Sequence, residues 1–101
     1  MIIATVKLRG REKKRREILQ TISGLGDQVR MIKGCFDVTS YQDINDQDTF
    51  YLVEEWQTQQ ALDEYLNSKL FSALLGTKTI LVEKPTVEFM TTENPNVAKE
   101  T

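Results

Sequence analysis

Hydrophobic and polar residues alternate at the start of the chain. Between residues 2 and 9, every second position is an aliphatic residue, namely Ile2, Ala4, Val6 and Leu8. An alternation of period two is typical of a β-strand with one buried face. We therefore predict a strand over residues 2–9, with Ile3, Thr5, Lys7 and Arg9 on its other face.

After Gly10 the spacing of apolar residues changes to three and four. The apolar positions are Ile18, Ile22, Leu25, Val29 and Ile32. This spacing predicts a helix that begins near Arg11 and packs one face on a sheet. Gly24 and Gly26 fall inside it and each weakens a helix by about 1 kcal/mol relative to alanine, so we expect a bend or an earlier end.

Two further strands follow, separated by the polar loop 43–48. Residues 35–41 predict a strand with Phe36 and Val38 on one face; the other face carries Cys35, Thr39 and Tyr41. Residues 50–56 predict the next strand, and the short loop makes the two antiparallel neighbours. Its first four residues are apolar or aromatic on both faces, so both faces of the sheet require cover.

Two short helical stripes come next. Thr58 is a suitable N-cap for the first, whose apolar residues are Ala61, Leu62, Tyr65 and Leu66. Asn67 and Ser68 interrupt the pattern, and Leu70, Phe71 and Leu74 begin the second stripe. We therefore predict a helix that is split in two.

The chain ends in a β-branched stretch and a polar tail. Residues 79–92 predict a fourth strand, which is either continuous or in two pieces. Pro85 has no amide to donate to a neighbouring strand, so it predicts a bulge or a sheet edge at that point. Gly76 is a candidate C-cap of the preceding helix. We expect one domain over residues 1–92 and a flexible tail over 93–101.

These elements give the order βαββαβ, an α+β fold of the ferredoxin-like type with a split second helix. Helices suffice for one face of its sheet only. We expect a second copy of the chain to cover the other face, which makes the protein a C2 homodimer and a dimeric α+β barrel.

Composition excludes several kinds of chemistry. The chain has no histidine and one cysteine, Cys35, so a serine–histidine triad, a disulfide within the chain and histidine-ligated haem are excluded, and a zinc site is disfavoured. We expect no metal or cofactor. The lack of a signal peptide or a long apolar segment predicts a soluble cytoplasmic protein that does not bind membranes.

Seven of the thirteen basic residues fall between Lys7 and Arg16. A nucleic-acid site is one interpretation, but no aromatic residue is interleaved for base stacking, and the formal net charge is -2. Glu12 with Arg16 and Lys13 with Glu17 stand four positions apart, as on a solvated helix face. We favour the solvated face and expect no nucleic-acid partner.

Three groups of residues resemble the antibiotic biosynthesis monooxygenase (ABM) family. They are Tyr41 with Asp43; Phe50, Leu52, Glu54 and Trp56; and Leu62, Leu66, Ser68 and Phe71. The resemblance covers all but the tail. The family includes cofactor-free quinol and polyketide oxygenases, haem-degrading enzymes and isomerases, so it implies the fold more firmly than the function.

This chain departs from the family where relatives carry histidine. Tyr65 replaces one histidine, and residues 73–75 offer none for haem. The resemblance then implies a cofactor-independent monooxygenase for a small aromatic or quinol-like compound, which itself reduces dioxygen in a dry pocket. The alternative is a non-catalytic small-molecule-binding or structural homodimer that has kept the fold.

The candidate site lies between the sheet and the split helix. Trp56 and Tyr65 are candidate hydrogen-bond donors and Glu54 a candidate base, because a carboxylate among apolar groups has a raised pKa. The remaining candidates are Thr5, which orients the substrate, and Leu66 and Phe71, which exclude water. Each has a structural alternative: the aromatic residues as core packing, and Glu54 as the ion-pair partner of a cation from the other subunit.

Overall fold

The computed structural model describes residues 1–75 and 80–91 of the chain. Within them, strands and helices follow the predicted order, with the second helix split. The elements are β1 (Ile2–Arg9), α1 (Arg15–Arg30), β2 (Cys35–Gln42), β3 (Thr49–Trp56), α2 (Gln59–Leu66), α3 (Lys69–Leu75) and β4 (Thr86–Thr91). None of the helices in this described part is long and apolar enough to cross a membrane.

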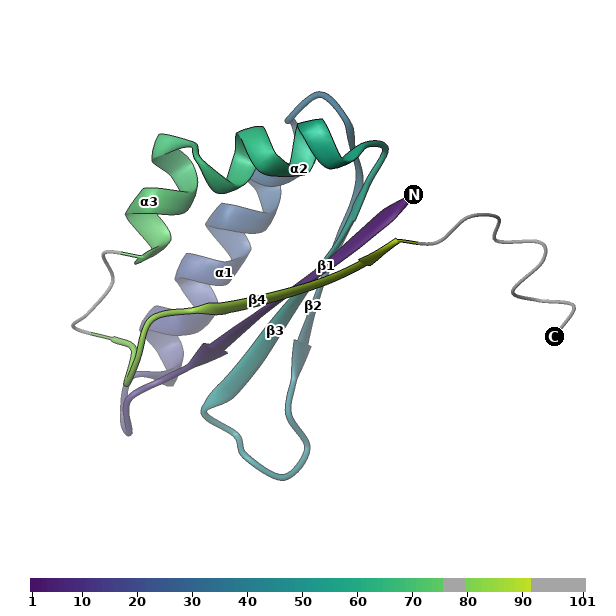
Figure 1. Ribbon diagram of the computed structural model, residues 1–101. Helices are drawn as coiled ribbons and strands as arrows, with labels where there is room; N and C mark the ends of the chain where they lie inside the picture. Colours follow the sequence, from purple (N-terminus) through teal and green to yellow (C-terminus); the bar gives the residue numbers. More distant parts are fainter. Residues whose placement is uncertain (76–79, 92–101) are drawn as a thin grey trace, which may run out of the picture.

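The four strands form one antiparallel sheet in the order β2-β3-β1-β4. Helices α1, α2 and α3 lie on one face of this sheet, and no described element covers the other face (Figure 1). The fold is therefore the predicted α+β, ferredoxin-like arrangement. The central strands β1 and β3 are hydrogen-bonded on both sides, which makes them the most constrained part of the sheet.

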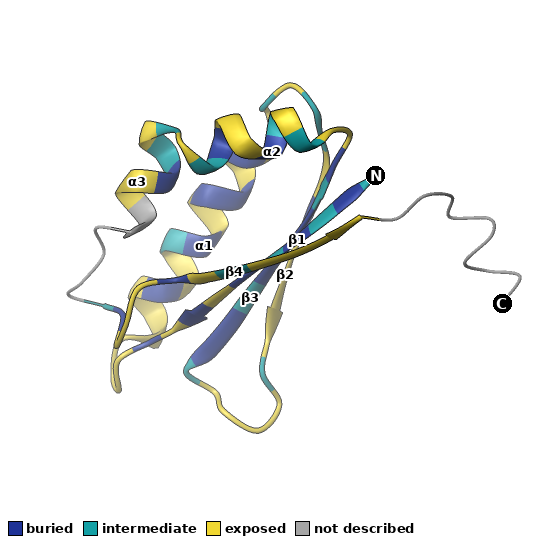
Figure 2. Cartoon of the chain, viewed as in Figure 1, coloured by how far each residue is buried: buried dark blue, intermediate teal, exposed yellow. Residues whose placement is uncertain are grey.

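The core lies between the sheet and the helices. Every second residue of β1 and β3 points into it, and α1 contributes the predicted apolar stripe (Figure 2). The buried residues are Ile2, Ala4, Val6 and Leu8 of β1; Phe50, Leu52, Glu54 and Trp56 of β3; and Ile18, Ile22, Leu25 and Val29 of α1. Glu54 is the only acidic residue in this set, and its position in the core requires an explanation.

Helix α1 begins at Arg15, four residues later than expected. Lys13 adopts a positive φ of 68°, a conformation that α-helices do not accommodate, so residues 11–14 form a turn instead. The predicted helical pairs of Glu12 and Lys13 are therefore wrong, because both residues precede the helix.

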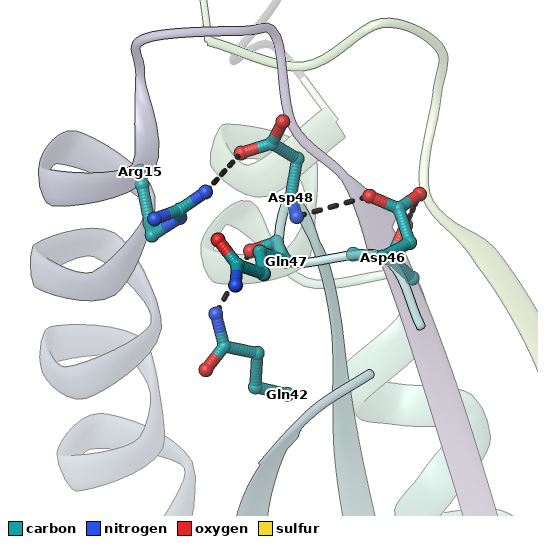
Figure 3. Close-up of polar contacts among 6 residues, drawn as sticks. Arg15, Gln42, Asp46, Gln47 and Asp48 are labelled. Carbon is teal, nitrogen blue, oxygen red and sulfur yellow. Dashed lines mark hydrogen bonds and ion pairs between the residues drawn. The ribbon is translucent and has the colours of Figure 1, made fainter. Parts of the chain in front are cut away.

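The basic residues pair instead with acidic residues of other segments. Arg15 lies 3.4 Å from Asp48 in the β2–β3 loop, as Figure 3 shows, and Arg9 lies 3.2 Å from Glu83. The same loop is closed by Gln42, whose side chain donates to the carbonyl of Gln47 at 2.9 Å. These contacts are largely exposed to solvent and fit the interpretation of a solvated surface.

Strand β2 departs from a simple alternation. A β-bulge lies between Cys35 and Asp37, so Cys35 is paired with Trp56 and Val38 with Glu54. Val38 is buried, whereas Phe36 is 57% exposed. The prediction that Phe36 and Val38 share a face is wrong, and Cys35 lies on the helix side with Val38.

Strand β4 begins immediately after Pro85. Before the proline, residues 80–82 continue the backbone hydrogen bonding. The amide of Arg11 donates to the carbonyl of Ile80 at 2.8 Å, and the amide of Val82 donates to the carbonyl of Arg9 at 2.8 Å. Of the strand predicted over residues 79–92, the described residues therefore contain β4 at the sheet edge and, before Pro85, an isolated bridge between Gly10 and Leu81. The candidate C-cap Gly76 and the tail 93–101 lie outside the described residues.

Candidate active site

Among residues 1–75 and 80–91, one carboxylate is buried beneath the helices. Glu54 lies in β3, opposite Ala4 of β1 and Val38 of β2, and its exposed fraction is 0%. Alternation along β3 places it on the same side as Leu52 and Trp56. Burial of an unpaired charge is costly, so the groups around this carboxylate determine its state.

Two neutral donors hold the Glu54 carboxylate. The indole Nε1–H of Trp56 donates to Oε1 at 3.2 Å, and the hydroxyl of Tyr65 donates to Oε2 at 3.0 Å. Trp56 comes from the same strand and Tyr65 from α2, so the carboxylate connects the sheet to the helix. Both donors were predicted as site residues with Glu54, and the structure brings the three together.

Removal from water raises the pKa of Glu54 from 4.5 to about 7, and the hydrogen bonds from Trp56 and Tyr65 oppose part of that rise. Burial and the neighbouring Glu54 charge also raise the pKa of Tyr65, so its phenol stays protonated and acts as a donor. A carboxylate that titrates near neutral pH is matched to the task of a general base. The raised pKa that the sequence predicted for Glu54 is confirmed.

The aromatic residues of the site form a continuous stack. The ring centroids of Trp56 and Tyr65 are 5.1 Å apart with planes at 26°, and Phe71 meets Tyr65 edge-on at 5.3 Å. Trp56, Tyr65 and Phe71 are each at most 5% exposed, and Leu66 is half-buried beside them. These rings therefore pack directly against one another.

The split of the second helix sets the positions of Tyr65 and Phe71. Helix α2 begins at the predicted cap, where Thr58 Oγ1 accepts the amide of Ala61 at 3.1 Å. It ends after Leu66, and Ser68 then joins the two helices. The Ser68 hydroxyl donates to the carbonyl of Tyr65 at 2.6 Å and accepts the amide of Phe71 at 3.2 Å.

Thr5 does not belong to this group. It is paired with Val53 and lies on the uncovered face of the sheet, whereas Glu54 and Trp56 point to the helices. The prediction that Thr5 borders the same pocket is therefore wrong. Thr5 instead lines a polar hollow of about 250 Å³ on the uncovered face, together with Lys7, Tyr51, Thr86 and Glu88.

Cys35 is the site neighbour that the sequence did not reveal. The bulge in β2 turns it toward the helix side, opposite Trp56. Burial and the Glu54 charge, in that order, raise the pKa of its thiol, and the Cys35 charge in turn acts on Tyr65. No sequence pattern marks a bulge at this position, so alternation placed Cys35 on the wrong face.

The described residues hold no group of three or more histidine, cysteine, aspartate or glutamate side chains that could bind a metal ion. The groups present around Glu54 are a buried carboxylate, two neutral hydrogen-bond donors, a set of aromatic rings and the neighbouring Cys35 thiol.

Comparison with protein-family models identifies the relatives of this chain. Residues 1–75 match the model described as antibiotic biosynthesis monooxygenase. The chain belongs to the ABM family. The match includes β1 to α3, and with them Glu54, its hydrogen-bond donors Trp56 and Tyr65, and Phe71. A comparison with curated proteins finds no match.

Solved structures with this fold come from several bacteria. A Deinococcus radiodurans protein described as a "putative antibiotic biosynthesis monooxygenase" superposes with a TM-score of 0.83 at 16% identity, covering 93% of this chain and 94% of its own. A Pseudomonas aeruginosa protein gives 0.78 at 18% identity, covering 92% and 94%. A Mycobacterium tuberculosis protein gives 0.80 at 16% identity, covering 92% and 95%. At these identities the comparison shows a shared fold.

Proposed function

We propose that the protein is a cofactor-independent monooxygenase that oxidises a small phenol-, quinol- or anthrone-like compound, with Glu54 as the general base. The observation that supports this most is the buried carboxylate of Glu54, which is hydrogen-bonded by two neutral donors and titrates near pH 7. A base with such a pKa is half ionised near neutral pH and can accept a proton from an acidic phenol. Membership of the ABM family supports the same class of reaction.

The proposed reaction needs no external reductant. With an anthrone as substrate, Glu54 accepts a proton, and the resulting anion transfers electrons to dioxygen. Two C–H bonds of the ring methylene and the O–O bond break, and a C=O bond forms. One oxygen atom enters the product and the other leaves as water, which takes up the two hydrogens. The four electrons lost by carbon are those gained by dioxygen.

The protein contributes position and exclusion of water. Trp56 fixes one oxygen of Glu54, and the aromatic rings keep the surroundings apolar, which strengthens electrostatic interactions with the substrate anion. Because Glu54 is 0% exposed, a substrate reaches it only after α2 or α3 moves. The interruption at Asn67 and Ser68 is the natural place for such a movement.

Oxygen consumption by metal-free protein with a panel of quinols and hydroxyanthrones tests this proposal. We expect turnover by the wild type and a 10²- to 10⁴-fold loss of kcat in Glu54→Gln, which keeps the volume but cannot accept the proton. Glu55→Gln is the matched control, because Glu55 is paired with Ile3 and points to the other face. Equal turnover in Glu54→Gln and wild type would refute the role of Glu54.

One observation favours a second function, that of a non-catalytic homodimer. The rings of Trp56, Tyr65 and Phe71 pack against one another as they would in an ordinary core. In that case the wild type consumes no oxygen with any substrate of the panel, and Glu54→Gln changes stability alone. Under both proposals the uncovered sheet face binds a second copy of the chain.

A further inference from the structure

Tyr65 places a phenol group where a phenolic ligand would bind. Its ring lies on the indole of Trp56, with centroids 5.1 Å apart, and its hydroxyl donates to Glu54 at 3.0 Å. A stacking surface together with a hydrogen-bond acceptor is what recognises a small phenol. The side chain of Tyr65 is itself such a compound: p-cresol attached to the backbone.

We propose that Tyr65 is a built-in occupant of the ligand subsite, and that a phenolic ligand binds by displacing the Tyr65 ring from Trp56 and Glu54. The contact between Tyr65 and Glu54 is then autoinhibitory, because it keeps the subsite filled until a ligand competes for it. This inference relies on the proposed function only for the class of ligand, since displacement is a binding event that needs no turnover.

The subsite has two halves, one on strand β3 and one on helix α2, and the strand half is held more firmly. Glu54 and Trp56 lie on β3, which is hydrogen-bonded to β1 on one side and β2 on the other. They keep their positions when a helix moves. The fixed half of the subsite therefore contains both groups that would contact the ligand.

Tyr65 lies on the half that can move. It is the second-to-last residue of α2, directly before the interruption at Asn67 and Ser68. Helix α3 beyond it has seven residues and holds Phe71 edge-on against the Tyr65 ring. Unwinding the last turn of α2 would withdraw Tyr65 without breaking any strand pairing, and Phe71 would move with it.

The first experiment removes the built-in phenol and supplies it as a free molecule. In Tyr65→Ala we expect p-cresol to bind roughly tenfold more tightly than toluene, the gain of a hydrogen bond to a charged group. In the double variant Tyr65→Ala, Glu54→Leu that preference is lost. Leu62→Ala, which also empties a fully buried position of α2, shows no preference for p-cresol. Equal binding of the two ligands by Tyr65→Ala would refute the proposal.

The second experiment tests displacement and keeps the ring. Tyr65→Phe loses only the hydroxyl that competes for Glu54, so p-cresol should bind it roughly tenfold more tightly than wild type. Trp56 is the single tryptophan, and its fluorescence reports binding at the subsite. Tyr51→Phe is the control, because the Tyr51 hydroxyl donates to Asp43 in the β2–β3 loop. If Tyr65→Phe binds p-cresol no better than wild type does, Tyr65 is not a competing occupant.

The outcomes separate this inference from the proposed function. If p-cresol binds as expected but the protein consumes no oxygen with any substrate, the proposed oxygenase activity is wrong and the proposed role of Tyr65 is supported. If oxygen consumption depends on Glu54 but p-cresol binds Tyr65→Phe and wild type equally, the proposed role of Tyr65 is wrong and the proposed oxygenase activity is supported. Because Tyr65→Phe preserves the core volume, this second comparison also decides the matter if Tyr65→Ala does not fold.

Discussion

Burial of the Glu54 carboxylate away from water destabilises the fold, and its neighbours reduce this penalty without removing it. Trp56 and Tyr65 each give it one hydrogen bond, yet both are neutral, so the carboxylate keeps most of the penalty of leaving water. That penalty is what raises its pKa. A core position filled by leucine would avoid the penalty, so this residue is a strong candidate for a functional role.

Stability should fall as the pH rises from about 4.5 through 7. The folded protein holds the Glu54 proton more tightly than the unfolded chain, so its contribution is fully present below the unfolded value and is lost above the folded one. The shift from 4.5 to about 7 corresponds to roughly 3 kcal/mol at the upper end. Urea unfolding at pH values from 4.5 to 8 measures this.

Glu54→Gln is the control for that slope, because its amide does not titrate. It should flatten the pH dependence over this window. Asp43 and Asp46 have lowered pKa values, caused first by hydrogen bonds from the Asn45 amide and the Thr49 hydroxyl, so their effects appear below pH 4. An unchanged slope in Glu54→Gln would show that another group titrates.

At the residue level, the sequence predicted that Glu54, Trp56 and Tyr65 lie together, but it wrongly placed Thr5 with them. Glu54 was recognisable because it shares a strand face with Leu52 and Trp56. The alternation of residues 2–9 already separated Thr5 from Ala4 and Val6. However, the sequence did not show which face of strand 50–56 points inward, because both of its faces are apolar. Only the pairing of Thr5 with Val53 reveals that Thr5 lies on the other side.

The end of a helix was predictable where a side chain caps it. Thr58 was predicted as the N-cap of α2 and caps it. The late start of α1 and the bulge in β2 were not predictable, because the first is a backbone conformation at Lys13 and the second is one extra residue in a strand. The extra residue breaks the alternation between Val38 and the residues before it, which is why Phe36 and Cys35 were placed on the wrong faces.

Thr58→Ala should destabilise the protein by about 1 kcal/mol, because the amide of Ala61 loses its acceptor at the start of α2. Urea unfolding measures the difference. Thr58→Ser keeps the hydroxyl and should remain close to wild type. Equal losses in both variants would indicate that the Thr58 methyl group, and not the cap, stabilises the helix.

Gly34 and Gly24 offer a matched pair of glycine-to-alanine substitutions. Gly34 has a φ of +96°, and a Cβ there would lie 2.7 Å from the Cβ of Ala61, so Gly34→Ala should destabilise by more than 1 kcal/mol. Gly24 lies inside α1, and an added Cβ would meet nothing within 4 Å apart from its chain neighbours and the backbone of its own helix, so Gly24→Ala should stabilise by about 0.5–1 kcal/mol. Thermal unfolding of both variants checks the opposite signs.

On the scale of the whole molecule, the sheet has one covered face and one open one. Sequence predicted this because the chain has helices for one face only, and the antiparallel pairing of β2 with β3 followed from the short loop between them. Tyr51 and Val53 on the open face are half-buried in a single chain. Met90 on β4 is 61% exposed and pairs with Ile3 of β1, which lies on the same face. These apolar side chains are the reason to expect a partner on this face.

We predict that this open face forms the interface of a C2 homodimer. Val53 lies on β3, second from one edge of the sheet, so Val53→Asp should bury a charge in the interface and weaken association at least tenfold. Leu19→Asp is the matched control, because Leu19 is 49% exposed on α1, on the helix side. Analytical ultracentrifugation at micromolar concentration should show a dimer for wild type and Leu19→Asp, and a monomer for Val53→Asp. A wild-type chain that sediments as a stable monomer would refute the interface and leave the apolar residues of this face without an explanation.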